Sequence, residues 1–369
     1  MKKNIIIIAM IIAMIIAMLF LGCTISGNDV VPGNDTSTDI SETTYIDATV
    51  KNDTTGVNDV TDIDNETPED DVESVNDSIN ENDETPKIVS ISFGIEHVVA
   101  VLSNGKVIAW GDNKFGQCDV PAEANRTIAV ASGPFHNLAL QEDGTVIAWG
   151  GDNFFGQLNV PQDLKDVIAV AAGEAHSVAL KIDGTVVAWG DYTLGQSIVP
   201  EDLPYIIAIA AGAYHTVALT KGGEIVFWGY NPDSDLNVPP YVNMPLKQIA
   251  SHYYHIIAVQ EDGTVTGWGR PEFSEDIPNE ELTDVIYISS GRGLSLALKK
   301  DGTVGLLGVR SYGLAEYAKQ LKDIKYVAAG FFVGGAVKED GTLYIWGKNV
   351  EKIYKNDKLD KLILYEGKD

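Results

Sequence analysis

The chain has 369 residues, of which 53 are acidic and 26 basic, so its formal net charge is −27 at pH 7. A chain this acidic is repelled by nucleic-acid phosphates and by anionic lipid surfaces, which excludes nucleic acid as its main partner and leaves the membrane reachable only through an anchor. It contains only two cysteines, Cys23 and Cys118, so the fold must depend on packing rather than on a set of disulfide bonds.

The first residues have the pattern of an export signal. Met1 and two lysines precede the apolar stretch 4–21, and residues 19–23 resemble a lipoprotein processing box that ends in Cys23. This pattern predicts a signal peptide over residues 1–22 and lipidation of Cys23. The alternative is an uncleaved anchor helix, since about 18 apolar residues can span a bilayer. In both cases the lysines stay inside and the rest of the chain faces outward.

Residues 24–86 differ in composition from the rest. They hold 18 acidic residues against the single Lys51. High net charge with low hydrophobicity does not offset the entropy lost on ordering, so we expect residues 23–86 to form a lipid-anchored, disordered acidic linker. A net charge of −12 remains on residues 87–369.

From residue 87 onward the chain repeats one unit seven times. The glycine of an Asp-Gly-like turn recurs at steps of 39 or 40 residues, and residues 167–200 show the unit most clearly. The seven glycines are Gly105, Gly144, Gly184, Gly223, Gly263, Gly302 and Gly341.

Within residues 167–200 the pattern predicts four strands. The apolar run 167–172 suits a strand that is buried on both faces. Two β-rich segments flank Asp183-Gly184, which is the strongest short-range signal for a hairpin. Residues 196–199 form a weaker fourth segment that ends at Pro200, a residue suited to a sheet edge. Each unit is therefore expected to be a four-stranded antiparallel sheet.

Seven such sheets predict an all-β, seven-bladed β-propeller over residues 87–369, because glycine and β-branched residues stand where helical repeats need alanine, leucine and glutamate. Six units carry a tryptophan at the same position, directly before a glycine, and Leu307 replaces it in the sixth unit. A large aromatic side chain that recurs once per unit is expected to pack between neighbouring blades. These residues are Trp110, Trp149, Trp189, Trp228, Trp268 and Trp346.

The repeats resemble a known family. The successive motifs A-x-A-A-G-x-x-H-x-x-A-L, D-G-T-V-x-A-W-G and D-N-x-x-G-Q-x-x-V-P are similar to the regulator-of-chromosome-condensation repeat in its short bacterial-type form, as in secreted members such as the propeller-type β-lactamase inhibitory protein. The resemblance covers residues 87–369 and implies a propeller. It implies less about activity, because propellers carry many unrelated functions. For the inhibitor family, it implies that aromatic residues in the loops of one face grip a partner protein.

The two ends of the repeat region are expected to meet. Residues 361–367 look like an eighth copy of the first strand of a unit. Either this segment or residues 88–93 should supply the strand that closes the ring, so that both ends share one blade. The sequence leaves these two alternatives open.

Five histidines recur at one position, three residues after the glycine, or after His252, that follows the first strand of a unit. A ring of imidazoles suggests a metal site, but a structural role in which each histidine satisfies its own turn is the stronger interpretation. The sequence contains no phosphate-binding loop, nucleophile elbow or C-x-x-C pair. We therefore predict no metal, no cofactor and no catalytic residue. The five histidines are His97, His136, His176, His215 and His255.

The two residues before each of these histidines, and their equivalents in the last two units, vary most between units. These short turns join corresponding strands, so all of them should emerge on one face, with the composition of a protein-binding surface. The alternative is that some of the rings pack over the central channel. The predicted binding face consists of Glu96, Phe135, Glu174, Tyr214, Tyr253, Tyr254, Arg292, Phe331 and Phe332. A second aromatic set, in the loops after each tryptophan, is expected to pack between blades: Phe115, Phe154, Phe155, Phe273 and Tyr312.

These features predict a monomeric, non-catalytic binding module, lipid-anchored outside the cytoplasm, that recognises a protein partner at the cell surface. Inhibition of that partner is one form this function can take. One alternative is an enzyme of envelope polymers, which is disfavoured because no unit holds a distinctive acid-base pair. The other is nucleotide exchange on a small GTPase, the activity for which the family is named, and this would require a cytosolic location.

Overall fold

The computed structural model describes residues 85–231, 234–242, 245–270, 282–308, 314–347, 350–356 and 358–366, all within one compact unit. The predicted signal peptide, Cys23 and almost all of the predicted linker lie outside the described residues, as do Phe273 and Tyr312. Within the described ranges, no helix is long and apolar enough to cross a membrane.

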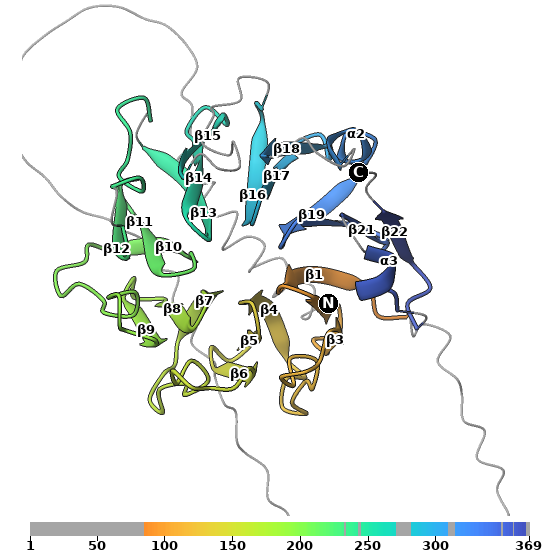
Figure 1. Cartoon of the computed structure of the whole chain (residues 1–369). Helices are drawn as coiled ribbons and strands as arrows, with labels where there is room; N and C mark the ends of the chain where they lie inside the picture. The colour runs from red at the N-terminus through yellow and green to blue at the C-terminus, as the bar shows by residue number, and fades with distance from the viewer. Residues whose placement is uncertain are drawn as a thin grey trace, which may run out of the picture. The chain divides into compact units, whose positions relative to one another are not determined.

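The described residues form seven sheets, one for each sequence unit (Figure 1). Sheets 1 to 3 consist of β1 (Ile88–Phe93), β2 (His97–Leu102) and β3 (Val107–Gly111); β4 (Thr127–Ser132), β5 (His136–Gln141) and β6 (Val146–Gly150); and β7 (Val167–Ala172), β8 (His176–Lys181) and β9 (Val186–Gly190). Sheets 4 and 5 consist of β10 (Ile206–Ala211), β11 (His215–Thr220) and β12 (Ile225–Gly229); and β13 (Leu246–His252), β14 (His255–Gln260) and β15 (Val265–Gly269). Sheets 6 and 7 consist of β16 (Val285–Gly291), β17 (Leu294–Lys299) and β18 (Val304–Gly308); and β19 (Ile324–Ala329), β20 (Val333–Lys338), β21 (Leu343–Gly347) and β22 (Leu362–Glu366). The described helices are short: α2 (Leu314–Ala318) and α3 (Val350–Ile353).

The first strand of the unit was predicted to be buried on both faces, and this was wrong for β7, where Ile168 is 40 % exposed. The middle strand of each sheet is the most deeply buried. In β8 every residue but the last is shielded from solvent. The hairpin to β9 turns at the Asp-Gly pair. Asp183 Oδ1 accepts hydrogen bonds from the N–H and the hydroxyl of Thr185, at 3.0 and 2.6 Å, and Gly184 has a φ of 79°. This turn fixes the register that pairs Trp189 with Ser177.

Among the described residues, six of the seven sheets have three strands, and the predicted fourth strand was wrong for sheets 1 to 4. In sheets 5 and 6 residues 271–281 and 309–313, which follow the third strand, lie outside the described ranges. In sheet 3 the expected strand at residues 196–199 belongs to a loop that turns at Gly195, which has a φ of 85°. The Gln196 side chain holds this loop, because its amide donates to Asp191 at 2.8 Å and its oxygen accepts from the N–H of Leu194 at 2.9 Å. The backbone of a loop held in this way cannot form a ladder along β9.

The sheets surround a common centre, with the first strand of each sheet innermost (Figure 1). First strands of consecutive sheets pack together from β1 to β19, and β19 packs against β1. The tryptophans fill the spaces between sheets. Trp149 of sheet 2 lies in a buried cluster with Val99 and Val101 of sheet 1, and Trp189 of sheet 3 packs with Leu138 of sheet 2. The prediction that these side chains pack between neighbouring sheets is confirmed at these positions.

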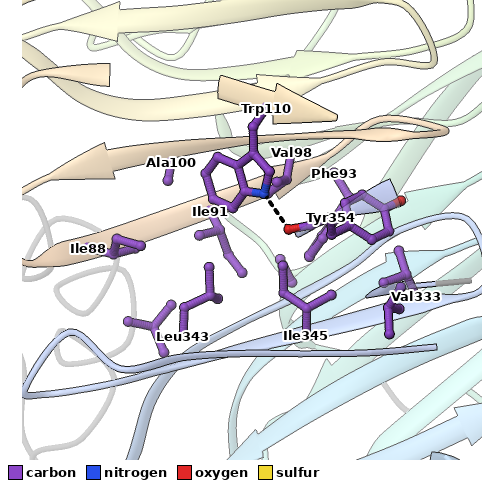
Figure 2. Packing of buried hydrophobic residues seen from close by; sticks show 13 residues of the cluster. Ile88, Ile91, Phe93, Val98, Ala100, Trp110, Val333, Leu343, Ile345 and Tyr354 are labelled. Atoms are coloured by element: carbon purple, nitrogen blue, oxygen red, sulfur yellow. Dashed lines mark hydrogen bonds between the residues drawn. The ribbon is translucent and has the colours of Figure 1, made fainter. Parts of the chain in front are cut away.

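Sheets 7 and 1 meet through apolar side chains. Ile91 and Phe93 of β1 lie in one buried cluster with Val333 of β20, and Tyr354, the residue after α3, completes it (Figure 2). The Tyr354 ring packs edge-on against Phe93, with 5.7 Å between ring centroids. Its backbone carbonyl accepts a hydrogen bond of 2.8 Å from the Trp110 indole. We call this group the seam cluster.

The ends of the repeat region do not share a sheet, so that prediction was wrong. Among the described strands, β1 pairs with β2 in sheet 1, whereas β22 joins the outer side of sheet 7, parallel to β21. Residues 361–367 resemble a first strand because an outer strand that packs on one face also needs apolar residues. Leu362 and Leu364 are such residues, and they pack against the seam cluster.

Candidate functional site

Both sets of variable loops emerge at the same end of the sheets. We call the Gly-x-x-His turns and their equivalents the inner turns (residues 94–97, 133–136, 173–176, 212–215, 252–255, 291–294 and 330–333), and the segments after Trp-Gly in sheets 1 to 3 the outer loops (residues 111–117, 150–157 and 190–196). The first N–H after Trp-Gly donates to the carbonyl of the residue before the histidine, over 2.8–3.1 Å, in the pairs Asp112–Glu96, Asp191–Ala175, Tyr230–Tyr214 and Arg270–Tyr254. Inner turns and outer loops therefore form one surface, the loop face.

Backbone hydrogen bonds connect the inner turns of neighbouring sheets. The N–H groups of Ile95, Glu174, Ala213 and Phe332 donate to the carbonyls of Pro134, Ala213, Tyr253 and Arg292, over 3.3, 3.2, 3.0 and 3.1 Å. Each bond fixes one turn against the next. The inner turns therefore make a rim whose side chains are held in position around the centre.

Beneath this rim, the five histidines link each sheet to the next. Their Nε2 atoms contact polar side chains of the following sheet in the pairs His97–Asn137 (2.8 Å), His136–Ser177 (3.2 Å), His176–Thr216 (3.1 Å), His215–Ser251 (2.8 Å) and His255–Ser290 (2.6 Å). The partner side chains bond onward, as when Thr216 donates to the Gln196 carbonyl at 2.8 Å. The expectation that each histidine satisfies its own turn was therefore wrong, because these bonds run between sheets.

Burial keeps three of these imidazoles neutral. Desolvation is the main cause that lowers the pKa of His136 and of His215 to about 3 and that of His176 to about 4, and neighbouring histidines contribute to the first two shifts. At neutral pH the three rings therefore carry no charge. Within the described ranges, no group of three or more His, Cys, Asp or Glu side chains is placed to hold a metal ion.

The inner turns of sheets 4 and 5 carry a group of half-buried aromatic residues. The centroid of Tyr254 lies 6.0 Å from that of Tyr214, 4.8 Å from that of Tyr253 and 6.3 Å from that of Tyr230. The Arg270 guanidinium lies over Tyr254, 4.7 Å from its centroid. These rings pack on one another and each still shows part of its surface to solvent.

A cavity of about 110 Å³ opens at the centre of the rim. Glu174, Tyr253, Arg292 and Phe331 line it from sheets 3, 5, 6 and 7, and Phe93 lines it from sheet 1. The Arg292 guanidinium lies 4.3 Å from the Tyr253 centroid and 4.7 Å from that of Phe331. Burial raises the pKa of Glu174, and the positive charge of Arg292 opposes this effect. The structure thus brings four of the predicted face residues to one point.

The other predicted residues lie around this centre. Phe332 contacts Phe331 edge-on at 5.1 Å between centroids, and Glu96 is exposed on sheet 1. Phe135 is 38 % exposed and meets Phe115 of the outer loop of sheet 1 at 5.2 Å between centroids. That contact joins an inner turn to an outer loop of the neighbouring sheet.

The outer-loop aromatics were predicted to pack between sheets, and this was wrong for those the structure describes. Phe115, Phe154 and Phe155 are 48, 79 and 45 % exposed, because the tryptophans already fill the space between sheets. Tyr192 and Leu194 of sheet 3 are also exposed, and neither was among the residues predicted from the sequence. Leu194 could have been found, since it stands directly before the loop glycine, as Phe115 and Phe155 do.

Comparison with known proteins gives matches to the repeats and to the fold. Residues 88–117, 128–157, 167–196 and 206–234 match the family model of the Regulator of chromosome condensation (RCC1) repeat. The chain is 35 % identical over 83 residues to protein pim1 of Schizosaccharomyces pombe, across 18 % of this chain and 15 % of pim1. It is 37 % identical over 76 residues to the ultraviolet-B receptor UVR8 of Arabidopsis thaliana, across 17 % of each chain. These alignments span about one sixth of the curated relatives.

Solved structures of similar fold cover far more of the chain. Prp20p of Saccharomyces cerevisiae superposes with a TM-score of 0.55 at 19 % identity, over 69 % of this chain and 84 % of its own. The receptor-kinase ectodomain of ACR4 from Arabidopsis thaliana gives 0.55 at 20 % identity, over 71 % and 96 %. The ectodomain of CR4 from Physcomitrella patens gives 0.57 at 16 %, over 71 % and 74 %. At sequence identities this low, the similarity shows a shared fold only.

Proposed function

Given that the chain carries RCC1 repeats in an RCC1-like β-propeller, we propose that it is a non-catalytic module that binds a protein partner on the loop face. The observation that carries this proposal is the exposure of large apolar side chains on the outer loops of three consecutive sheets. We also propose that the seven sheets are the blades of one seven-bladed propeller and that the protein is a monomer.

Exposed rings in neighbouring loops are the main support. Phe154 and Phe155 contact each other edge-on at 5.0 Å between centroids, and Phe115 and Phe135 form a similar pair. Single exposed apolar residues are common, but paired rings on adjacent loops leave a surface that gains free energy when a partner covers it. Aromatic side chains also supply much of the binding energy of protein interfaces.

The solved neighbours supply a precedent for this kind of role. The structure of Prp20p was described together with its binding to Gsp1p and histones. A propeller of similar fold can therefore hold protein partners. For the present chain, the identity of the partner and any inhibition of it belong to the proposal.

The test compares capture of proteins by two variants of the full-length chain. Wild-type protein should retain a partner from an extract of the cell's envelope. The variant with Phe115, Phe135, Phe154 and Phe155 all changed to Ser should lose it, because the exposed rings are gone. The control is Ile182→Ser, which removes a side chain that is 63 % exposed beside the Asp-Gly turn at the opposite end of the sheet. Equal capture by the wild type and the quadruple variant would refute the proposal.

We propose further that the module is held outside the cytoplasm by a lipid on Cys23. The basic start, the apolar stretch 4–21 and the processing box support this placement. Cys23→Ala should block lipidation and leave the signal uncleaved, which mass spectrometry of the mature N-terminus and labelling with a radioactive fatty acid would detect. An unlabelled wild-type protein that starts at Met1 would favour an anchor helix instead.

Nucleotide exchange on a small GTPase is the second candidate, and the four RCC1 repeats favour it. It predicts that the purified chain speeds release of labelled GDP from a small GTPase of its host. It also requires the chain to reach the cytosol, which fractionation of cells would reveal. Binding without exchange supports the first candidate.

A further inference from the structure

The central cavity of the loop face has a composition of its own, which the exposed outer rings do not explain. We propose that it receives the cationic end of a lysine or arginine side chain from the partner, with Glu174 as counter-charge and aromatic rings as the walls. This inference rests on the proposed function, since the side chain belongs to the protein that the loop face binds.

The size of the cavity favours a single side chain. At about 110 Å³ it is well below the roughly 300–1,000 Å³ of typical small-molecule sites. It is open at the surface where the inner turns meet, and its walls come from six sheets. A side chain projecting from a docked protein can enter such a site, whereas a nucleotide or a cofactor of similar size cannot.

Among the described groups that line the cavity, the Glu174 carboxylate is a negative charge without a hydrogen-bonding or ion-pair partner. It is half-buried, and it makes no hydrogen bond or ion pair with any of the described residues. Burial raises its pKa by more than Arg292 lowers it, so its negative charge is held at a cost. A cation placed beside it would remove that cost and form a charge-assisted hydrogen bond.

The walls suit a cation as well. Tyr253, Phe331 and Phe93 line the cavity, and the face of an aromatic ring attracts a positive charge. The structure already contains this interaction, because the Arg292 guanidinium lies over both Tyr253 and Phe331. The Arg292 guanidinium thus lies against the rings, and the Glu174 carboxylate is left without an ion pair among the described residues.

The net negative charge of the repeat region also favours a cationic ligand. Residues 87–369 carry a net charge of −12, which draws basic partners toward the protein and repels acidic ones. Near the cavity, burial raises the pKa of the Tyr214 hydroxyl, and the negative charges of Glu174 and Asp191 raise it further. Arg292 and His252 are the opposing basic groups among the lining residues, and burial lowers the pKa of His252 to about 3, which leaves it uncharged at neutral pH.

The turns that build the cavity are strained where the sequence departs from the repeat. Tyr253 and Phe332 have φ values of 53° and 55°, a left-handed conformation that aromatic residues rarely adopt, and Gly293 in the turn between them has 74°. The described inner turns of sheets 1 to 4 contain no positive φ. Strain of this kind persists where a function requires it. The irregular sequence of the last three units is therefore better explained by a built site than by relaxed constraint.

The test uses N-acetyl-L-lysinamide as the probe and N-acetyl-L-norleucinamide as its uncharged counterpart. Saturation-transfer NMR on the full-length protein should show binding of the lysine probe and little binding of the norleucine probe. Glu174→Gln should weaken lysine-probe binding about tenfold or more, since it removes a charge-assisted bond without changing the size of the side chain. The control Glu96→Gln removes a carboxylate that is exposed on the same face and should leave binding unchanged.

Three results would overturn the inference: equal binding of both probes, lysine-probe binding that survives Glu174→Gln, or tighter binding of N-acetyl-L-aspartate that is lost in Arg292→Gln. Near-ultraviolet circular dichroism of each variant confirms that the fold is intact. The proposed function fails separately, because it depends on the loss of partner capture in the quadruple phenylalanine variant. A partner that needs the outer rings but is indifferent to Glu174 would leave the function standing and refute the cationic anchor.

Discussion

Neighbouring sheets are joined in two different ways. From sheet 1 to sheet 6, a buried histidine of one sheet reaches a polar side chain of the next. From sheet 6 through sheet 7 to sheet 1, Leu294 and Val333 stand at the histidine position and lie in apolar clusters. The same arrangement of strands therefore accepts a directional polar joint or a non-directional apolar one.

The polar and apolar joints have different physical properties. Hydrogen bonds depend on angle, so the histidine joints hold the inner turns in a fixed orientation. Apolar packing depends on shape alone, and it lies where the ring closes and beside the strained turn at Phe332. The polar joints have one weakness that the apolar joints lack: protonation of the imidazole places a positive charge in a buried site.

The largest expected effect is therefore acid unfolding that begins at the histidine joints. The pKa values of His136, His176 and His215 in the folded state lie below the unfolded value of about 6.5, so the unfolded chain binds protons that the folded chain excludes. The free energy of unfolding should be constant above pH 6.5 and fall below it, by about 1.4 kcal/mol per pH unit for each histidine.

Urea titrations at pH 7.5 and 5.5 would measure this fall, and hydrogen exchange would locate it. The amides of β8 should lose protection before those of β20 as the pH is lowered. His176→Gln removes one titrating group and should reduce the slope by that group's share. A stability that does not change between these two pH values would contradict the comparison.

A loss of about 3–5 kcal/mol is expected when the apolar seam is broken by Tyr354→Ala. The side chain is only 2 % exposed, and its removal leaves a cavity between sheets 7 and 1 (Figure 2). Urea denaturation at pH 7.5 measures the change. The matched variant Tyr354→Phe keeps the ring and loses only the bond of 3.2 Å from the hydroxyl to the Ile95 carbonyl, so it should cost about 1 kcal/mol. Equal losses in the two variants would mean that the seam does not depend on packing.

A smaller loss, about 1–3 kcal/mol, is expected for Gly173→Ala at a polar joint. A methyl group at this position would overlap the His176 imidazole and push it from its partner on the next sheet. The control is Gly222→Ala at an exposed turn, where the nearest atom would be Thr220 Oγ1 at 3.6 Å. Thermal unfolding should separate the two variants, and equal melting temperatures would count against a tight joint.

The smallest effect, about 1 kcal/mol, is expected for Ser177→Ala. The hydroxyl lies 3.2 Å from His136 Nε2 and donates to the Gln157 carbonyl at 2.9 Å, so its loss breaks one joint without creating a large cavity. As a reference, Arg126→Ala breaks an exposed ion pair of 3.2 Å with Glu142 and should change stability by less than about 0.5 kcal/mol. If urea denaturation gives equal losses of stability for Ser177→Ala and Arg126→Ala, a polar joint stabilises the fold no more than an exposed ion pair does.

Features that depend on neighbours along the chain were predictable. The hairpin at Asp183-Gly184 and the position of the tryptophans follow from local pattern and from the repeat. The partner of each histidine was not predictable, because His97 and Asn137 are 40 residues apart and meet only through the ring. The exposure of Phe154 was likewise out of reach, since it depends on which side chain fills the space between sheets.

By itself, the sequence determined the repeat, the hairpins and the likeness of four repeats to the RCC1 repeat, because turn chemistry and hydrophobic pattern act over a few residues. Only the tertiary structure decided that sheets 1 to 4 have three strands, that β22 runs parallel at the outer edge, and that Glu174 and Arg292 share one cavity. Glu174 and Arg292 are more than a hundred residues apart in the chain, so only packing around the ring brings them together. The other two features depend on how loops and outer strands pack against their own sheets.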